Sequence, residues 1–148
     1  MRALVVALGL AVAACSQPTS APTPPAIEAP TGADAQAEAL LAVITPTVST
    51  ELGVPVSLEQ SHIRIMNEWA WVIAIPRQPN GAPIDWMTTT RASAYENGVM
   101  DESGATYTLL KQEAGAWGMV AQTIAPTDVA WLSWPEEYGA PAALFERE

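Results

Sequence analysis

The sequence has almost none of the residues from which disulfides and metal centres are built. Its 148 residues include one cysteine and one histidine, so no disulfide can form within the chain and the usual zinc ligand sets are excluded. The acidic segment 101–104 lacks the alternating ligands of a calcium loop, and no Gly-x-Ser-x-Gly nucleophile elbow is present. We therefore expect no metal, no cofactor and no enzymatic activity.

Positive charge is also scarce. Lysine and arginine together number 6, against 16 aspartate and glutamate residues, which gives a formal net charge of −10 at pH 7. Binding to nucleic acid and flat adsorption to an anionic lipid surface both use clustered positive charge, so we expect neither. The acidic balance favours a neutral or basic partner, or serves solubility alone.

A short apolar run at the N-terminus ends in the only cysteine. Arg2 precedes the run 3–14, whose last residues, Val12-Ala13-Ala14, lead directly into Cys15. This is the pattern of a secretory signal, and the run is shorter than the about 20 residues that span a bilayer. It resembles a bacterial lipoprotein signal, whose lipobox is aliphatic-small-small-Cys. An ordinary secreted protein with a stray thiol is the alternative.

The lipoprotein resemblance implies how the N-terminus is processed and where the protein resides. Residues 1–14 would be a signal peptide, and Cys15 would carry a diacylglycerol on its sulfur and a fatty acyl chain (palmitate) on its new amino group. Several acyl chains on one residue make a stable membrane anchor. In the Gram-negative lipoproteins that this signal resembles, an Asp directly after the cysteine retains the protein in the inner membrane. Ser16 stands there instead, which implies the outer membrane, facing the periplasm.

Proline and small residues dominate the segment after the anchor. Residues 15–33 contain five prolines and few large apolar side chains, a composition that favours an extended chain of about 3.1 Å per residue. We interpret this segment as a tether between the bilayer and the domain; a segment with no spacing role is the alternative. Residues 34–148 then form a single domain of ordinary size.

Apolar residues recur every three to four positions from Asp34 to Leu52, which predicts a helix. Gly53 ends it. Pro46 falls inside this run, so we expect a kink there, with Thr45 as the cap of a second helical segment. The expected core stripe, with Leu40 beside it, consists of Ala37, Leu41, Ile44, Val48 and Leu52.

Beyond the helix the apolar period changes to two, which predicts strands. Residues 56–65 form the first expected strand, with a bulge near Ser61-His62, and residues 69–75 form a central strand that is apolar on both faces. Residues 106–113 and 117–125 form a predicted hairpin. Its second strand is expected to turn one set of side chains to the same side: Trp117, Met119, Ala121 and Thr123.

The pattern determines the secondary structure of two further segments less directly. Residues 84–96 fit either a strand or a short helix covering the sheet, and residues 129–145 fit a tryptophan-rich cap of short helices and turns. One helix followed by an antiparallel meander predicts an α+β fold. The expected architecture is an N-terminal helix packed on a curved antiparallel sheet of about four strands, with a C-terminal Trp-rich cap.

The order of elements over residues 34–125 resembles the cystatin-like and nuclear-transport-factor-2-like folds, in which a helix lies in the concave face of such a sheet. Residues 126–131 (Pro-Thr-Asp-Val-Ala-Trp) and 138–145 (Tyr-Gly-Ala-Pro-Ala-Ala-Leu-Phe) resemble a group of uncharacterised bacterial lipoproteins. That second resemblance implies no activity.

Tryptophan is the remaining signal, with six residues against one phenylalanine. Trp86, Trp131 and Trp134 fall in loop or cap segments, where aromatic side chains can anchor a partner surface or line a ligand pocket. The alternative is that they plug the open end of the sheet.

These observations together predict a lipid-anchored, non-enzymatic envelope protein that binds another envelope protein, with Trp86, Trp131 and Trp134 as contact residues. The alternative function is a carrier or sensor that holds a small apolar ligand in a cavity between the helix and the sheet. A third hypothesis, an enzyme in that cavity, requires His62 to converge with Asp85 or Asp128.

Overall fold

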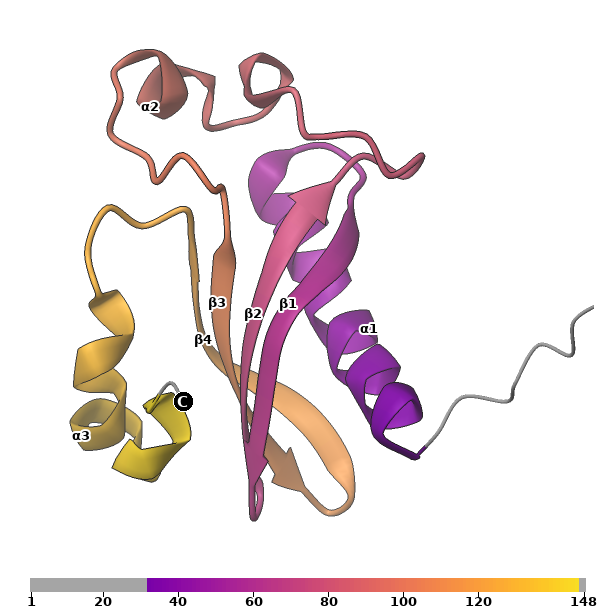
Figure 1. Ribbon diagram of the computed structural model, residues 1–148, viewed down its shortest axis with the longest axis vertical. Helices are drawn as coiled ribbons and strands as arrows, with labels where there is room; N and C mark the ends of the chain where they lie inside the picture. The colour runs from indigo at the N-terminus through magenta and orange to yellow at the C-terminus, as the bar shows by residue number, and fades with distance from the viewer. Residues whose placement is uncertain (1–31, 147–148) are drawn as a thin grey trace, which may run out of the picture.

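The computed structural model describes residues 32–146, in which one helix is followed by a four-stranded antiparallel sheet and by short C-terminal helices (Figure 1). The strands follow one another as neighbours in the order β1-β2-β3-β4, so β1 and β4 are the edges of an open meander. Their bounds are Ser57–Met66, Trp69–Arg77, Thr106–Glu113 and Ala116–Ile124. The α+β prediction is confirmed, whereas the predicted signal, Cys15 and nearly all of the tether lie outside the described residues.

Helix α1, Gly32–Leu52, covers one face of the sheet (Figure 1). Its fully buried residues lie a constant four positions apart: Leu40, Ile44, Val48 and Leu52. The predicted stripe was wrong at one residue. It contained Leu41 and placed Leu40 beside the stripe, whereas Leu40 is the buried residue. A constant step of four selects a single row of side chains, and Leu41 lies beside that row, partly exposed.

Pro46 does not divide this helix. The helix continues from Gly32 to Leu52, and the Thr45 hydroxyl donates to the Leu41 carbonyl at 2.7 Å instead of capping a new segment. The prediction of a second helical segment was therefore wrong. Pro46 is exposed, so the carbonyl that its missing N–H leaves unpaired can turn to water. Gly53, at φ 71°, ends the helix as expected.

Strand β2 is central and apolar on both faces, as the sequence predicts. Ala70 and Val72 belong to the core under α1, while Trp69, Trp71 and Ile73 belong to a second core on the opposite face. The small residues let α1 approach the sheet closely, and the large ones fill the space under the smaller elements of the cap. The sheet is thus the middle of three layers.

Both edge strands carry a bulge. In β1 the register shifts between Gln60 and His62, where the sequence predicts it, and Ser61 is the extra residue. In β4, Ala121 pairs with Leu109 and Met119 with Leu110, so Val120 is the extra residue. The single-sided alternation predicted for β4 was wrong, because this bulge turns Trp117 and Met119 toward α1 but Ala121 and Thr123 toward the cap side.

Residues 84–96 form two short helices rather than a strand: η1, Trp86–Thr88, and α2, Ala92–Glu96. Asp85 begins η1, and its side chain accepts a hydrogen bond from the Met87 N–H at 3.1 Å. The helical alternative of the prediction is confirmed, but α2 lies beyond the end of the strands instead of covering the sheet (Figure 1).

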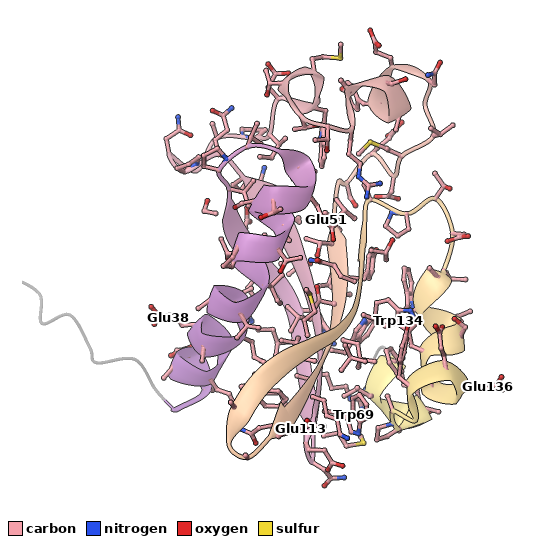
Figure 2. The ribbon with its side chains drawn as sticks, turned by 180° about the vertical axis from the view of Figure 1, so that it is seen from behind. Glu38, Glu51, Trp69, Glu113, Trp134 and Glu136 are labelled. Carbon is pink, nitrogen blue, oxygen red and sulfur yellow. The ribbon has the colours of Figure 1, made fainter. Side chains whose placement is uncertain are left out.

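The C-terminal cap covers part of the sheet face opposite α1 (Figures 1 and 2). It consists of η2, Ala130–Ser133, α3, Trp134–Tyr138, and η3, Ala142–Phe145. Gly139 adopts φ 74° and ends α3, with its N–H bonded to the Pro135 carbonyl. Leu144 is fully buried in the cap-side core, so the cap is fixed to the sheet by packing.

Candidate functional site

A cavity of about 670 Å³ lies on the cap-side face of the sheet. Strands β1, β2 and β3 and the segment before β3 line it, and no residue of the cap helices does. The side chains that define it are apolar at Ile73 and Ile75 and polar at His62, Arg64 and Tyr107; Ser61, Ile63, Ser103 and Ala105 complete the lining. Its volume falls in the range of sites that hold small organic ligands.

Among the residues that the structure describes, Arg64 is the only charged one that lines this cavity, although the whole chain is strongly acidic. Its side chain is held at one end, because Nη1 donates to the backbone carbonyl of Glu146, just after η3. A guanidinium has five N–H donors in a fixed plane, so further donors remain for another group. The cavity is therefore locally cationic within an anionic molecule.

Two buried nitrogens beside the cavity have no hydrogen-bond partner among the described residues: Nε2 of His62 and Nε1 of Trp71. The two rings meet edge to face, with centroids 5.4 Å apart. An indole N–H can only donate, and leaving such a group buried and unpaired costs about 1–3 kcal/mol. Both nitrogens are enclosed by protein, and of the two residues only His62 lines the cavity.

Aromatic contacts connect the cavity to the cap. Tyr107, a lining residue, stacks on Trp131 with centroids 4.1 Å apart and an interplanar angle of 14°. Phe145 of η3 packs against both Trp71 and Trp134, at 5.5 Å and 6.2 Å between centroids. The position of the cap beside the cavity therefore depends on ring packing rather than on backbone pairing.

The three predicted contact tryptophans do not form one surface. Trp134 is 5% exposed and lies between sheet and cap (Figure 2), so in this conformation it is a packing residue. Trp131 is partly exposed and adjoins the cavity through Tyr107. Trp86 packs against the helix-side core and lies so close to Gly104 that a Cβ there would be 2.5 Å from its ring.

Exposed apolar side chains surround Trp131 in the sequence. Val129 is 53% exposed and Leu132 is 64% exposed, both at the start of the cap. Neither belongs to the two cores of the domain. With Trp131 they form what we call the η2 surface, Val129, Trp131 and Leu132.

The residues required by the enzyme hypothesis are not brought together in the cavity. His62 lines it, but Asp85 and Asp128 do not, and Asp85 lines a separate pocket with Val54 and Thr88. Within residues 32–146, no group of three or more His, Cys, Asp or Glu side chains could hold a metal ion. The pKa of Tyr138 is raised from its ordinary value, first by its hydrogen bond with Glu137.

Sequence reasoning missed Arg64, and it expected a cavity on the other face, between helix and sheet. A signal for Arg64 was present, because His62 and Arg64 alternate with Ile63 and Ile65 in one strand. Two polar residues on the face that also carries two tryptophans of the neighbouring strand indicate a site rather than a closed core. The part of the sheet that stays open depends on how far the cap extends over it, and the sequence pattern of the strands does not predict that extent.

Comparisons of the chain with protein-family models, with curated proteins and with solved structures found no match. In the described part of the chain, 32–146, no helix is long and apolar enough to cross a membrane. The functional argument therefore rests on the residues and the geometry given above.

Proposed function

We propose that this protein is a lipid-anchored envelope lipoprotein whose domain binds another envelope protein and catalyses no reaction. Cys15 carries the anchor, the proline-rich segment spaces the domain from the outer membrane, and the domain faces the periplasm. The support for the anchor is the apolar run 3–14 with its small residues before Cys15. The support for a binding role comes from the described domain.

The η2 surface is the observation that carries the binding proposal. Leu132 and Val129 are large apolar side chains that the fold leaves in solvent, and they flank the partly exposed Trp131 in the sequence. Exposed apolar and aromatic groups close together are typical of protein interfaces. The partner would place an apolar side chain against Trp131 and Leu132, and its surface would be neutral or basic opposite this acidic chain.

Crosslinking in intact cells followed by pull-down from envelopes tests both parts of the proposal. The native chain should fractionate with membranes and recover one protein in stoichiometric amount, whereas Cys15→Ser should release the chain from membranes and lower that recovery. Equal membrane association of the two forms would contradict the anchor. Recovery of nothing by a membrane-bound native chain would contradict the protein partner.

A second function, transport or sensing of a small ligand, is favoured by the cavity itself. Its volume of about 670 Å³ and its mixed lining of isoleucine, tyrosine and a few polar groups match the usual composition of ligand sites. Native mass spectrometry of the chain isolated from its own envelope would show a persistent added mass if this function holds. A bare chain in every preparation would leave the protein partner as the function.

A further inference from the structure

We infer that the cavity on the cap-side face binds a small carboxylate with an apolar tail. This inference rests on the second function above, ligand binding in the cavity, and names the chemical class of the ligand. Three features of the site support it: the sign of its charge, its hydrogen-bond donors and its apolar floor.

The charge of the lining selects an anion. Of residues 32–146, Arg64 lies in the wall and no aspartate or glutamate does, although such residues outnumber lysine and arginine in the full sequence by 16 to 6. Among the other polar lining groups, Ser61, Tyr107 and His62 can donate a hydrogen bond, whereas the Ser103 hydroxyl already donates to Asp101 Oδ1. A wall of donors around one guanidinium suits a carboxylate, which accepts through both oxygens.

Arg64 is already positioned for this contact. Its Nη1 is committed to the Glu146 carbonyl, which restricts the guanidinium and leaves its other N–H groups for a second acceptor. His62 also lines the cavity and lies two residues before Arg64 on the same face of β1, so both side chains border the space that a carboxylate would occupy.

The apolar part of the cavity selects the tail. Ile73 and Ile75 of β2, Ala105 and the ring of Tyr107 give a floor without charge. Ser61 and Ser103 are exposed lining residues, so the cavity is open to solvent at these positions and a small amphiphile can enter. A medium-chain monocarboxylate has both parts that the site requires.

The test uses three probes of equal chain length: octanoate, octanamide and octylammonium. Each is titrated into the full chain carrying Cys15→Ser, which cannot be acylated there, while amide and indole N–H resonances are recorded. The Trp71 indole resonance, assigned through Trp71→Phe, is the local reporter because this ring contacts His62. We expect octanoate to shift it and to bind at least about tenfold more tightly than octanamide, with no binding of octylammonium, as charge-assisted hydrogen bonds predict.

Variants separate the site from general charge effects. Arg64→Gln should remove the preference for octanoate over octanamide, and Arg64→Lys should retain part of it. Arg91→Gln is the matched control, because it also removes one positive charge but from a residue that pairs with Glu51 outside the cavity. The same spectra report whether each variant is folded.

The outcomes distinguish this inference from the function on which it rests. Equal binding of octanoate and octanamide at the cavity would overturn the carboxylate while retaining a ligand site. Absence of any shift at Trp71 with all three probes would overturn both the carboxylate and the small-ligand function. Loss of octanoate preference in Arg91→Gln as well as Arg64→Gln would also overturn the inference, because the effect would then be nonspecific.

Discussion

The two faces of the sheet are built differently, although the same strands supply both. On one face, a 21-residue helix presents Leu40, Ile44, Val48 and Leu52, all fully buried, to small residues of β2. On the other, three short helical segments present aromatic rings to Trp69 and Trp71 and leave a cavity of about 670 Å³ beside them (Figures 1 and 2).

The polar groups differ in the same way. Facing α1, Thr106, Thr108 and Gln122 hydrogen-bond to one another at 3.3 to 3.4 Å, and only the Gln122 carbonyl oxygen is left unpaired. On the cap side, His62 and Trp71 each have an unpaired buried nitrogen, and the cavity lies on the same face of the sheet. The face under α1 therefore mainly stabilises the fold. The cap side also packs into a core, but it keeps a cavity that is open for binding. Four predictions test this contrast.

Removal of the largest cap-side ring should have the largest effect. Trp71→Ala deletes a side chain that is fully buried and contacts His62, Trp131 and Phe145. We expect the free energy of unfolding to fall by about 3–5 kcal/mol, measured by urea denaturation. Met87→Ala, at a side chain 49% exposed, is the control and should change it by less than about 0.5 kcal/mol. A loss below about 1 kcal/mol in Trp71→Ala would contradict the claim that packing around Trp71 on the cap side stabilises the fold.

Gly104→Ala should have the next largest effect, because it affects the junction between the two faces. The new Cβ would meet the Trp86 ring at 2.5 Å, and the residue has φ +66°. We expect a loss of about 1–3 kcal/mol in the free energy of unfolding. Gly98→Ala is closely matched, with φ +65° and no atom within 4 Å of its Cβ, so it isolates the backbone cost. Equal losses in the two variants would show that Trp86 is not held where we place it.

The same methyl group removed from each face should have unequal effects. Ile44→Val creates a void in a closed interface and should cost about 0.5–1.5 kcal/mol. Ile75→Val removes a methyl group beside the existing cavity, so the loss in the free energy of unfolding should be smaller. Urea denaturation measures both losses: each variant should lower the midpoint while the slope of the free energy of unfolding against urea concentration stays unchanged. A larger loss for Ile75→Val would reverse the assignment of the two faces.

Leu132→Asp should have almost no effect on stability but should lower partner recovery. The side chain is 64% exposed and outside both cores, so the free energy of unfolding should change by less than about 0.5 kcal/mol. A charge in the centre of an apolar contact should lower recovery of the crosslinked partner. Unchanged recovery would remove the η2 surface from the binding site.

Much of this fold can be predicted from sequence because its periodic segments are strong. The helix ending at Leu52, the bulge at Ser61 and the double-sided strand from Trp69 are all encoded within a few residues of where they occur. The alternation in β4 could not be predicted, because the extra residue Val120 is recognisable only from its pairing with β3. The placement of Leu40 over Leu41 likewise depends on which row of α1 the sheet selects.

The site was harder to predict than the fold. Composition indicates that aromatic residues matter, but it cannot tell that Trp134 is buried while Leu132 is exposed, since the two are separated by one residue. The alternation of β1 places Arg64 on one face of the strand, but only the structure shows that, within residues 32–146, no acidic residue lines the same cavity. The combination of a cationic group, unpaired nitrogens and open space is a property of packing between distant segments.

The most direct test of the account is a comparison of photo-crosslinking from the two layers in living cells. A photoreactive residue is placed at Leu132, on the cap side, and at Glu38, an exposed position on α1 at the far side of the molecule (Figure 2). The account predicts one discrete protein adduct from position 132 and none from position 38. A discrete adduct from position 38 with none from position 132 would contradict it, because the binding face would then be the outer surface of α1.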